Sequence, residues 1–372
     1  SKLTIIYVNG VGGIYKVEAG GNISVSVIDT CYNARCLYEC ALFSLARFCN
    51  GHSRVIGIVY YNLYVFKINE VCFLNFLLLS VIILKRAENK NLITCYRLVF
   101  ENVKGFSIGF NMILVPASTS TLGKSGPDGV NVTVTKDSET KLFKRCAVNN
   151  AAYDYYARCS PDDLNMALPP RGMRIWLFHK MQASSALMMH HGAVMDMNVV
   201  SSFLGDFAPL IQVFLPDLTI GLKGRDDYAS IYSEVCHELA HASHFSKVGT
   251  DYWNKYIIYV LGSYVSSGGM TYGDGTGVNA GYCEVGEMWA YHMSSKMYHD
   301  RYGGDYPYFG SIFWFHPHDL RYIEEKGIES WEIFSLLDSS VNSCDALRRA
   351  LVAYSPDKSD QIEHIFNRYM QL

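Results

Sequence analysis

The spacing of hydrophobic positions changes character near residue 140 of the chain. Before that point, short runs rich in Val, Ile, Tyr and Phe are separated by turns of Gly, Asn and Asp, a pattern typical of β structure. The stretch 31–49 is compatible instead with one short helix. The predicted strands cover residues 3–8, 23–28, 55–68, 71–84 and 92–100. We therefore expect residues 1–140 to form a β-rich, sandwich-like domain, whose role the sequence does not indicate.

A Ser-, Thr- and Gly-rich stretch at 118–137 marks the expected domain boundary, and apolar residues then recur with the helical period. Short apolar runs at 174–179, 212–215 and 218–222 predict a few strands. The predicted helices cover residues 141–158, 228–247, 252–266, 282–302, 331–337, 344–354 and 360–370. Residues 141–372 are thus expected to form a mainly helical domain with a small sheet, so the predicted fold class is α+β.

Composition excludes several classes of protein. The 372 residues are 49% hydrophobic and 18% charged, with a net charge of −3, so the chain is neither disordered nor basic enough for a nucleic-acid partner. The most apolar stretch, 71–84, contains Asn75 and is shorter than the roughly 20 residues needed to cross a bilayer. No transmembrane helix is expected. The 11 cysteines include no CxxC pair and are expected to be ordinary buried thiols.

The segment HELAH at 237–241 points to a specific chemistry. On a helix, His237 and His241 lie one turn apart on the same face and can bind one Zn²⁺ ion. Glu238 faces the same cleft and is placed to take a proton from a zinc-activated water. The alternative interpretation is a buried helix whose histidines only satisfy hydrogen bonds.

The residues around this motif independently predict a helix. Asp226 or Asp227 can cap its N-terminus, and Gly249 suits the position after its end. A stripe of apolar residues repeats every four positions, at Ile231, Val235 and Leu239. The motif therefore lies in the helical context that its chemistry requires.

A third zinc ligand is expected from the later helix at 282–302, which Gly303 ends. This helix carries Glu284 and Glu287, three residues apart and so on one face. By spacing alone, either carboxylate could reach the metal.

The combination of HELAH with a later helix containing EMWA at 287–290 resembles the gluzincin metallopeptidases. In that pattern, a Glu followed by an aromatic residue and an alanine is the third zinc ligand. The resemblance implies a zincin-like fold with Glu287 as ligand, and leaves Glu284 as an outer partner of the site or an alternative ligand. His244 does not fit the metzincin spacing, and we expect it to support a ligand, to line the cleft or to pack structurally.

A closer similarity covers residues 140–372. The segments HELAHASHF, AGYCEVGEMWAY, DRYGGDYP and FNRY, with a Gly-rich loop between the helices, resemble zinc metallopeptidase lipoproteins on the outer-membrane surface of gut-type anaerobes. Some of these associate with TonB-dependent nutrient transporters and their surface lipoproteins. The resemblance implies an extracytoplasmic, outer-membrane location with a lipid anchor in the precursor, a peptide or protein substrate, and the transporter complex as partner. The sequence begins at Ser1 without the lipid-bearing Cys or a signal segment, and we interpret it as a processed form.

The expected reaction is hydrolysis of a peptide bond by zinc-activated water, with Glu238 as general base. Tyr282 is the candidate donor to the oxyanion, with Tyr272 and His292 as alternatives. We expect loop 267–281 to form a lid or substrate-binding wall, and the strand beside the metal helix to offer its edge to an extended substrate. The alternative functions are a catalytically silent binding or accessory subunit of an uptake complex, and a glycan-binding protein.

Two further histidine pairs are not expected to bind metal. His190 and His191 are adjacent, so they point in different directions, and a loop or core role is predicted. His316 and His318 belong to an aromatic turn at 313–318, which we interpret as a packed corner.

Overall fold

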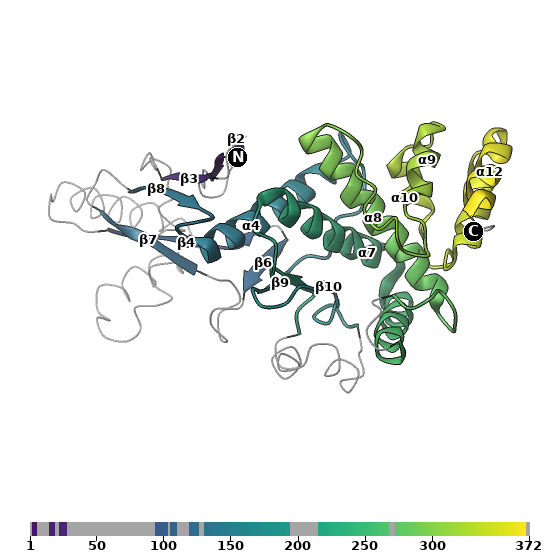
Figure 1. Cartoon of the computed structure of the whole chain (residues 1–372), viewed down its shortest axis with the longest axis horizontal. Helices are drawn as coiled ribbons and strands as arrows, with labels where there is room; N and C mark the ends of the chain where they lie inside the picture. Colours follow the sequence, from purple (N-terminus) through teal and green to yellow (C-terminus); the bar gives the residue numbers. More distant parts are fainter. Residues whose placement is uncertain are drawn as a thin grey trace, which may run out of the picture. The chain divides into compact units, whose positions relative to one another are not determined.

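The computed structural model of the chain describes residues 2–5, 15–18, 22–27, 94–102, 105–109, 119–125, 130–193, 215–267 and 272–369. The chain divides into two compact units. One consists of Ser1–Leu98 with Thr119–Phe143, and the other of Val99–Ser118 with Lys144–Leu372. The described residues form a mixed α and β fold (Figure 1).

The described part of the first unit is made of strands. A four-stranded sheet has the order β2-β1-β3-β8, and β4 pairs separately with β7. The bounds are β1 (Lys2–Ile5), β2 (Tyr15–Glu18), β3 (Asn22–Val27), β4 (Thr94–Val99), β7 (Thr119–Ser125) and β8 (Val130–Thr135). Strands thus occur at three of the predicted runs, whereas the predictions for 31–49, 55–68 and 71–84 lie outside the described residues. The sandwich stays a prediction.

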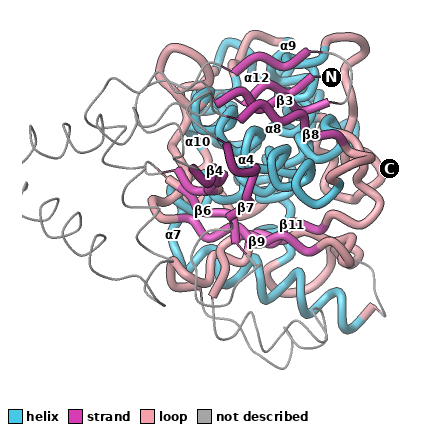
Figure 2. Tube along the Cα trace, turned by 90° about the vertical axis from the view of Figure 1, so that its left-hand side faces the viewer, coloured by secondary structure: helices cyan, strands magenta, loops and turns pink. Residues whose placement is uncertain are grey.

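The second unit contains a five-stranded sheet of order β10-β11-β9-β6-β5. Its three middle strands run parallel and side by side (Figure 2), and the two outer strands are antiparallel to their neighbours. The bounds are β5 (Glu101–Asn102), β6 (Phe106–Gly109), β9 (Met173–Phe178), β10 (Ser185–Ala186) and β11 (Leu218–Gly221). The predicted boundary near residue 140 puts residues 99–118 in the first domain, whereas Val99–Ser118 belongs to the second unit, where β6 pairs with β9. Residues 212–214 of a predicted strand lie outside the described residues.

Helix α4 (Thr140–Arg158) connects this sheet to the rest of the unit. Its predicted apolar face is fully buried, at Val148, Ala151, Ala152 and Tyr155. The ring of Tyr156 packs 5.3 Å from that of Phe106 on β6, and the Tyr155 hydroxyl donates to Ser243 Oγ at 2.9 Å. The helix therefore contacts both the sheet and the helix that carries HELAH.

Helix α7 (Tyr228–Ser266) carries the HELAH segment and consists of two helical parts that meet at Gly249. Asp227 caps its N-terminus, because its Oδ1 accepts from Ser230 N at 2.8 Å. The predicted apolar stripe is fully buried, at Ile231, Val235 and Leu239. Gly249 has φ 78° and ψ −179°, a conformation essentially restricted to glycine. Both predicted helices, the cap and the break between the helices are confirmed.

Helix α8 (Ala280–Tyr302) runs alongside α7 (Figure 1) and ends at Gly303, as predicted. Shorter helices follow: α9 (Asp319–Glu325), α10 (Ser330–Leu336), α11 (Cys344–Tyr354) and α12 (Ser359–Tyr369), with a 3₁₀ turn at Pro356–Lys358. Three of these four helices match predicted ones, and α9 is an addition. Among the described residues, no helix has both the length and the apolar character needed to span a membrane.

Five cysteines of the described residues have free thiols. Cys146, Cys159, Cys236 and Cys283 are buried, and Cys344 is half-buried. Burial raises the pKa of the Cys146 thiol to about 12, so this thiol stays protonated and unreactive at neutral pH. The prediction of ordinary buried thiols is confirmed for the four buried residues.

Candidate metal centre

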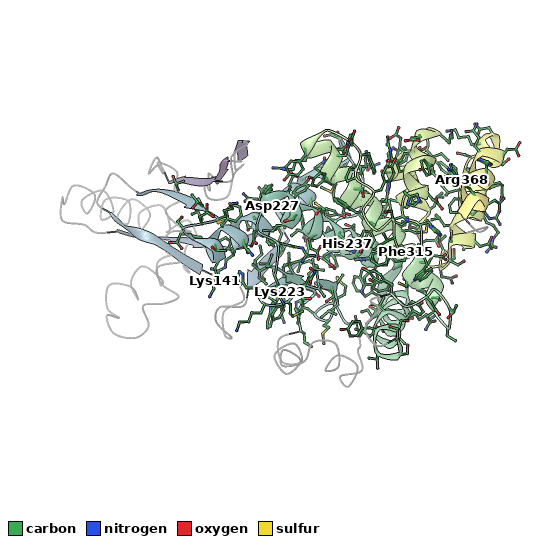
Figure 3. All side chains as sticks on the ribbon, in the orientation of Figure 1. Lys141, Lys223, Asp227, His237, Phe315 and Arg368 are labelled. Carbon is green, nitrogen blue, oxygen red and sulfur yellow. The ribbon has the colours of Figure 1, made fainter. Side chains whose placement is uncertain are left out.

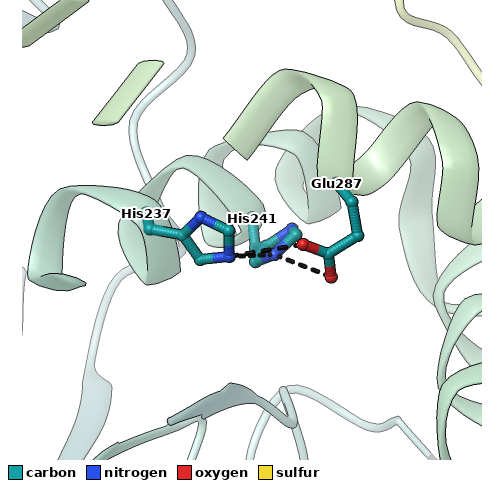
Figure 4. Close-up of side chains that lie close together, drawn as sticks. All are labelled: His237, His241 and Glu287. Atoms are coloured by element: carbon teal, nitrogen blue, oxygen red, sulfur yellow. Dashed lines mark hydrogen bonds and ion pairs between the residues drawn. The ribbon is translucent and has the colours of Figure 1, made fainter. Parts of the chain in front are cut away.

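His237, His241 and Glu287 come together between α7 and α8 (Figure 4). The Nε2 atoms of the two histidines are 3.1 Å apart. Glu287 Oε2 lies 3.4 Å from His237 Nε2, and Glu287 Oε1 lies 3.4 Å from His241 Nε2. Among the described residues, this is the single group of three or more His, Cys, Asp or Glu side chains arranged to hold a metal ion.

The spacing of these atoms fits a tetrahedral zinc ion. Zinc binds nitrogen and oxygen ligands at about 2.0–2.1 Å, so neighbouring ligand atoms in a tetrahedron are about 3.3 Å apart. The Nε2–Nε2 separation of 3.1 Å and the 3.4 Å separation between His237 Nε2 and Glu287 Oε2 agree with that value, and the ligand atoms of the group all lie within 4.8 Å of one another. Lone pairs of three buried side chains meet at one point, an arrangement that a cation stabilises. The described part of the chain could therefore hold a metal ion here.

The ionisation of His241 and Glu287 also suits a cation. Burial lowers the pKa of His241, which keeps this imidazole neutral and its Nε2 lone pair available. Burial by itself raises the pKa of Glu287, but the imidazoles of His241 and His237 outweigh burial and hold this pKa well below its usual range. Neutral histidine and ionised glutamate are the forms that bind zinc.

Glu238 lies directly after the first candidate ligand and is only 4% exposed. Its Oε2 atom is buried and has no hydrogen-bond partner among the described residues. Burial raises the pKa of this carboxyl well above its usual range, and the negative charges of Glu234 and Glu287 raise it further. A buried carboxyl group with an unused oxygen is thus available beside the His–His–Glu group.

Aromatic side chains enclose the group. The ring of Tyr291 lies 4.3 Å from that of His237, and the Tyr256 and Trp253 rings lie 5.4 and 5.6 Å from that of His241. Tyr291 also stacks on Phe315, which Figure 3 shows in the same part of the fold as His237. Tyr256 OH donates to Glu287 Oε1 at 2.6 Å.

Tyr256, Tyr291 and Trp253 are not among the site residues predicted from the sequence. Tyr291 follows Glu287 by four positions on α8, and that helical spacing could have identified it. The other two lie beyond Gly249, and no spacing to the motif indicates that the chain brings them back to it.

Glu284, which was considered as an alternative metal ligand, instead binds the backbone of a later helix. Its Oε2 accepts a hydrogen bond from Cys344 N at 2.6 Å, the first backbone amide of α11. Burial raises the pKa of the Glu284 carboxyl, and this hydrogen bond opposes the increase. The carboxylate caps α11, and Glu287 is the glutamate that the fold places beside the two histidines.

The candidate oxyanion donors are placed differently from one another. Tyr282 OH accepts from Lys255 Nζ at 3.0 Å and from Asn342 Nδ2 at 3.4 Å, and none of the contacts described for this residue reaches the His–His–Glu group. Tyr272 OH lies 3.2 Å from Tyr291 OH, next to His237. Among the predicted donors, Tyr272 is therefore the one that the fold brings close to the site.

His292 faces the opposite side of α8. Its Nε2 atom lies 3.3 Å from Ser330 Oγ and 3.7 Å from Glu324 Oε2, so it connects α8 to α9 and α10. It is not a donor to the His–His–Glu group in this arrangement.

His244 is fully buried between Tyr252 and Trp253, with ring centroids 5.2 and 6.2 Å away. Burial lowers its pKa to about 3, and neither ring nitrogen has a hydrogen-bond partner among the described residues. Of the roles considered for His244, structural packing is the one that this environment supports.

His191 and the aromatic turn at 313–318 occupy structural positions. His191 Nδ1 lies 2.9 Å from Asp217 Oδ1 and its Nε2 lies 3.0 Å from Arg171 O, so the predicted loop role is confirmed. In the aromatic turn, Phe315 is 1% exposed and Trp314 Nε1 donates to Tyr272 O at 3.1 Å. The turn packs against the loop before α8, as predicted for a packed corner.

The predicted substrate edge needs one correction. Strand β11, which immediately precedes α7, pairs with neighbours on both sides, and among the described strands β10 lies at this edge of the sheet. Trp253 Nε1 on α7 donates to Ala186 O of that strand at 3.0 Å. The sheet edge therefore lies beside the metal helix, but a side chain of that helix already uses one of its carbonyl groups. Residues 268–271 of the predicted lid lie outside the described residues.

The chain was compared with known protein families, curated proteins and solved structures. No protein family model, no curated protein and no solved structure matches the chain.

Proposed function

We propose that this protein is a zinc-dependent hydrolase that cleaves peptide bonds. The observation that supports this proposal is the buried group of His237, His241 and Glu287, whose ligand atoms all lie within 4.8 Å of one another. Zinc bound there would polarise the scissile carbonyl and acidify a water molecule. The HExxH spacing and the gluzincin-like position of Glu287 favour peptide hydrolysis over other zinc chemistry.

Glu238 is the proposed general base. It takes a proton from the attacking water and then gives that proton to the leaving amine. Glu238 therefore ends the reaction ionised, as it began. Its position directly after the first candidate ligand and its unused Oε2 support this assignment, since a carboxylate with both oxygens hydrogen-bonded would be engaged elsewhere.

The hydroxyl pair of Tyr272 and Tyr291 is the proposed donor to the oxyanion, in place of Tyr282. In a pair of hydroxyl groups 3.2 Å apart, one donates to the other, and the accepting hydroxyl keeps its own proton for another acceptor. Tyr291 holds this pair against His237. The substrate's identity, the outer-membrane location and the transporter partner stay predictions of the family resemblance.

The test combines zinc content with peptide cleavage. We expect one zinc per chain in the parent protein and in Glu284→Ala, and none in Glu287→Ala, by elemental analysis. Glu238→Gln should keep zinc and lose cleavage of a peptide library by about 10²–10⁴-fold, whereas Glu284→Gln should cleave at close to the parent rate.

The outcomes separate the alternatives. Cleavage by Glu238→Gln at the parent rate would refute the assignment of the base. A parent protein that binds one zinc but cleaves no peptide would favour the catalytically silent binding subunit, and a parent protein that binds no zinc after reconstitution would refute the metal centre itself.

A further inference from the structure

Tyr256 contacts two of the three candidate zinc ligands. Its hydroxyl donates to Glu287 Oε1 at 2.6 Å, and its ring lies 5.4 Å from that of His241. Tyr256 is 6% exposed, so the hydrogen bond is shielded from water. It lies in the second part of α7, which turns back toward α8 at Gly249.

Neighbouring residues fix the position of the Tyr256 ring. On one side the Trp253 ring packs at 4.5 Å with an interplanar angle of 31°, and Trp253 is itself attached to β10 through Ala186 O. On the other side, a Cβ atom at position 286 would lie 3.3 Å from the ring, a close approach that glycine permits. The ring is thus held between a tryptophan and the backbone of α8, directly beside Glu287.

The hydrogen bond distinguishes the two oxygens of Glu287. Oε1 accepts from Tyr256, whereas Oε2 is buried and has no hydrogen-bond partner among the described residues. Oε1 lies 3.4 Å from His241 Nε2 and Oε2 lies 3.4 Å from His237 Nε2, but the bond from Tyr256 uses one lone pair of Oε1 and holds the carboxylate in one orientation. A carboxylate without that bond could rotate or offer both oxygens.

We propose that Tyr256 is a positioning residue for the metal centre, which fixes the orientation of the Glu287 carboxylate so that Oε2, which accepts no hydrogen bond from Tyr256, is the oxygen directed to zinc. The inference rests on the proposed function only in assuming that zinc binds this group, and it does not depend on peptide cleavage. Partners that orient metal ligands contribute about 10–100-fold to metal affinity. Tyr256 touches no substrate in this role and acts through Glu287.

The competing explanation is that the Tyr256 hydroxyl only stabilises the fold. Tyr252 provides a matched control, because it lies on the same part of α7, is 3% exposed and donates its hydroxyl to a backbone carbonyl, Val341 O, at 3.1 Å. Tyr252→Phe likewise removes a buried tyrosine hydrogen bond, but one that does not involve Glu287. A purely structural role predicts the same effect on zinc binding for both variants.

The experiment measures zinc dissociation constants by competition with a chromophoric chelator, on the parent chain, Tyr256→Phe and Tyr252→Phe. We expect Tyr256→Phe to still bind one zinc at saturation, with a Kd raised about 10–100-fold, and Tyr252→Phe to remain within about twofold of the parent. The Co²⁺-loaded proteins give a second readout, since a changed carboxylate geometry in Tyr256→Phe should alter the visible absorption of the bound ion.

Equal zinc affinities for Tyr256→Phe and the parent, or equal losses in both Phe variants, would overturn the proposal. If Tyr256→Phe does not fold, Gly286→Ala replaces it. The added Cβ pushes the Tyr256 ring, and with it the hydroxyl, away from its position beside Glu287 without removing the hydroxyl group. That variant should bind zinc more weakly than the parent, and unchanged affinity would refute the positioning role. A parent protein that binds zinc but cleaves no peptide would contradict the proposed hydrolysis and leave this inference intact.

Discussion

The break in α7 at Gly249 gives a prediction that can be worked out from the backbone alone. With φ 78° and ψ −179°, Gly249 lies in a region that side chains avoid, and alanine there costs about 1–3 kcal/mol. A Cβ atom at this position would meet no atom within 4 Å. The cost of Gly249→Ala is therefore backbone strain rather than a steric clash.

Gly262 lies on the same helix and supplies the control. It has ordinary helical geometry, is exposed, and an added Cβ there also meets nothing within 4 Å. Because alanine is favoured over glycine in a helix interior by about 1 kcal/mol, Gly262→Ala should stabilise the protein. The two substitutions make the same chemical change, and we expect their unfolding free energies to differ by about 2–4 kcal/mol, in opposite directions from the parent.

Urea denaturation of the parent and of both variants, monitored by circular dichroism, measures these differences. A destabilisation of 1 kcal/mol corresponds to a decrease in Tm of about 2–4 °C for a unit of this size, so thermal unfolding provides an independent check. If Gly249→Ala is as stable as the parent, or more stable, then α7 can straighten without cost. The strain argument would then be wrong.

Two further predictions concern side chains with assigned partners. Glu284→Ala removes the carboxylate that accepts from Cys344 N. Urea titrations should show an unfolding free energy lower by about 1–3 kcal/mol, and the zinc content should not change. Loss of zinc would instead make Glu284 a ligand. The hydrogen bond that the His191 ring donates to the Asp217 carboxylate raises the pKa of His191 against the lowering effects of burial and Arg174. This interaction stabilises the fold fully below the unfolded pKa of about 6.5, and the stabilisation is lost as pH rises through the higher folded pKa. His191→Gln should therefore flatten the pH dependence of the unfolding free energy above about pH 6.5. An unchanged profile would refute this assignment.

The main features of the second unit follow from local sequence. The helical period predicts α4, both parts of α7 and α8, because each helix buries one face against the core. The cap at Asp227 and the break at Gly249 depend only on neighbouring residues. HExxH spacing likewise places His237 and His241 on one helix face.

Other features depend on contacts that spacing does not contain. Glu284 and Glu287 share a helix face, and only the N-terminus of α11, about sixty residues later in the chain, shows which glutamate is engaged elsewhere. Tyr256 reaches Glu287 because α7 turns back, and the direction of that turn is a tertiary feature. Tyr282 is predicted as the oxyanion donor because it lies at the start of the helix that carries Glu287. In the fold, however, its hydroxyl is bound by Lys255 and Asn342.

The fold-back of α7 also affects how the centre can assemble. The candidate ligands, the proposed base and the positioning residue all belong to α7 and α8, so no distant strand has to be in place before they meet. Closing the chain between His237 and Glu287 carries a modest entropic cost, since that cost grows only with the logarithm of loop length. A metal ion that binds the paired helices favours their pairing by mass action, so zinc would act as a folding ligand for this pair of helices.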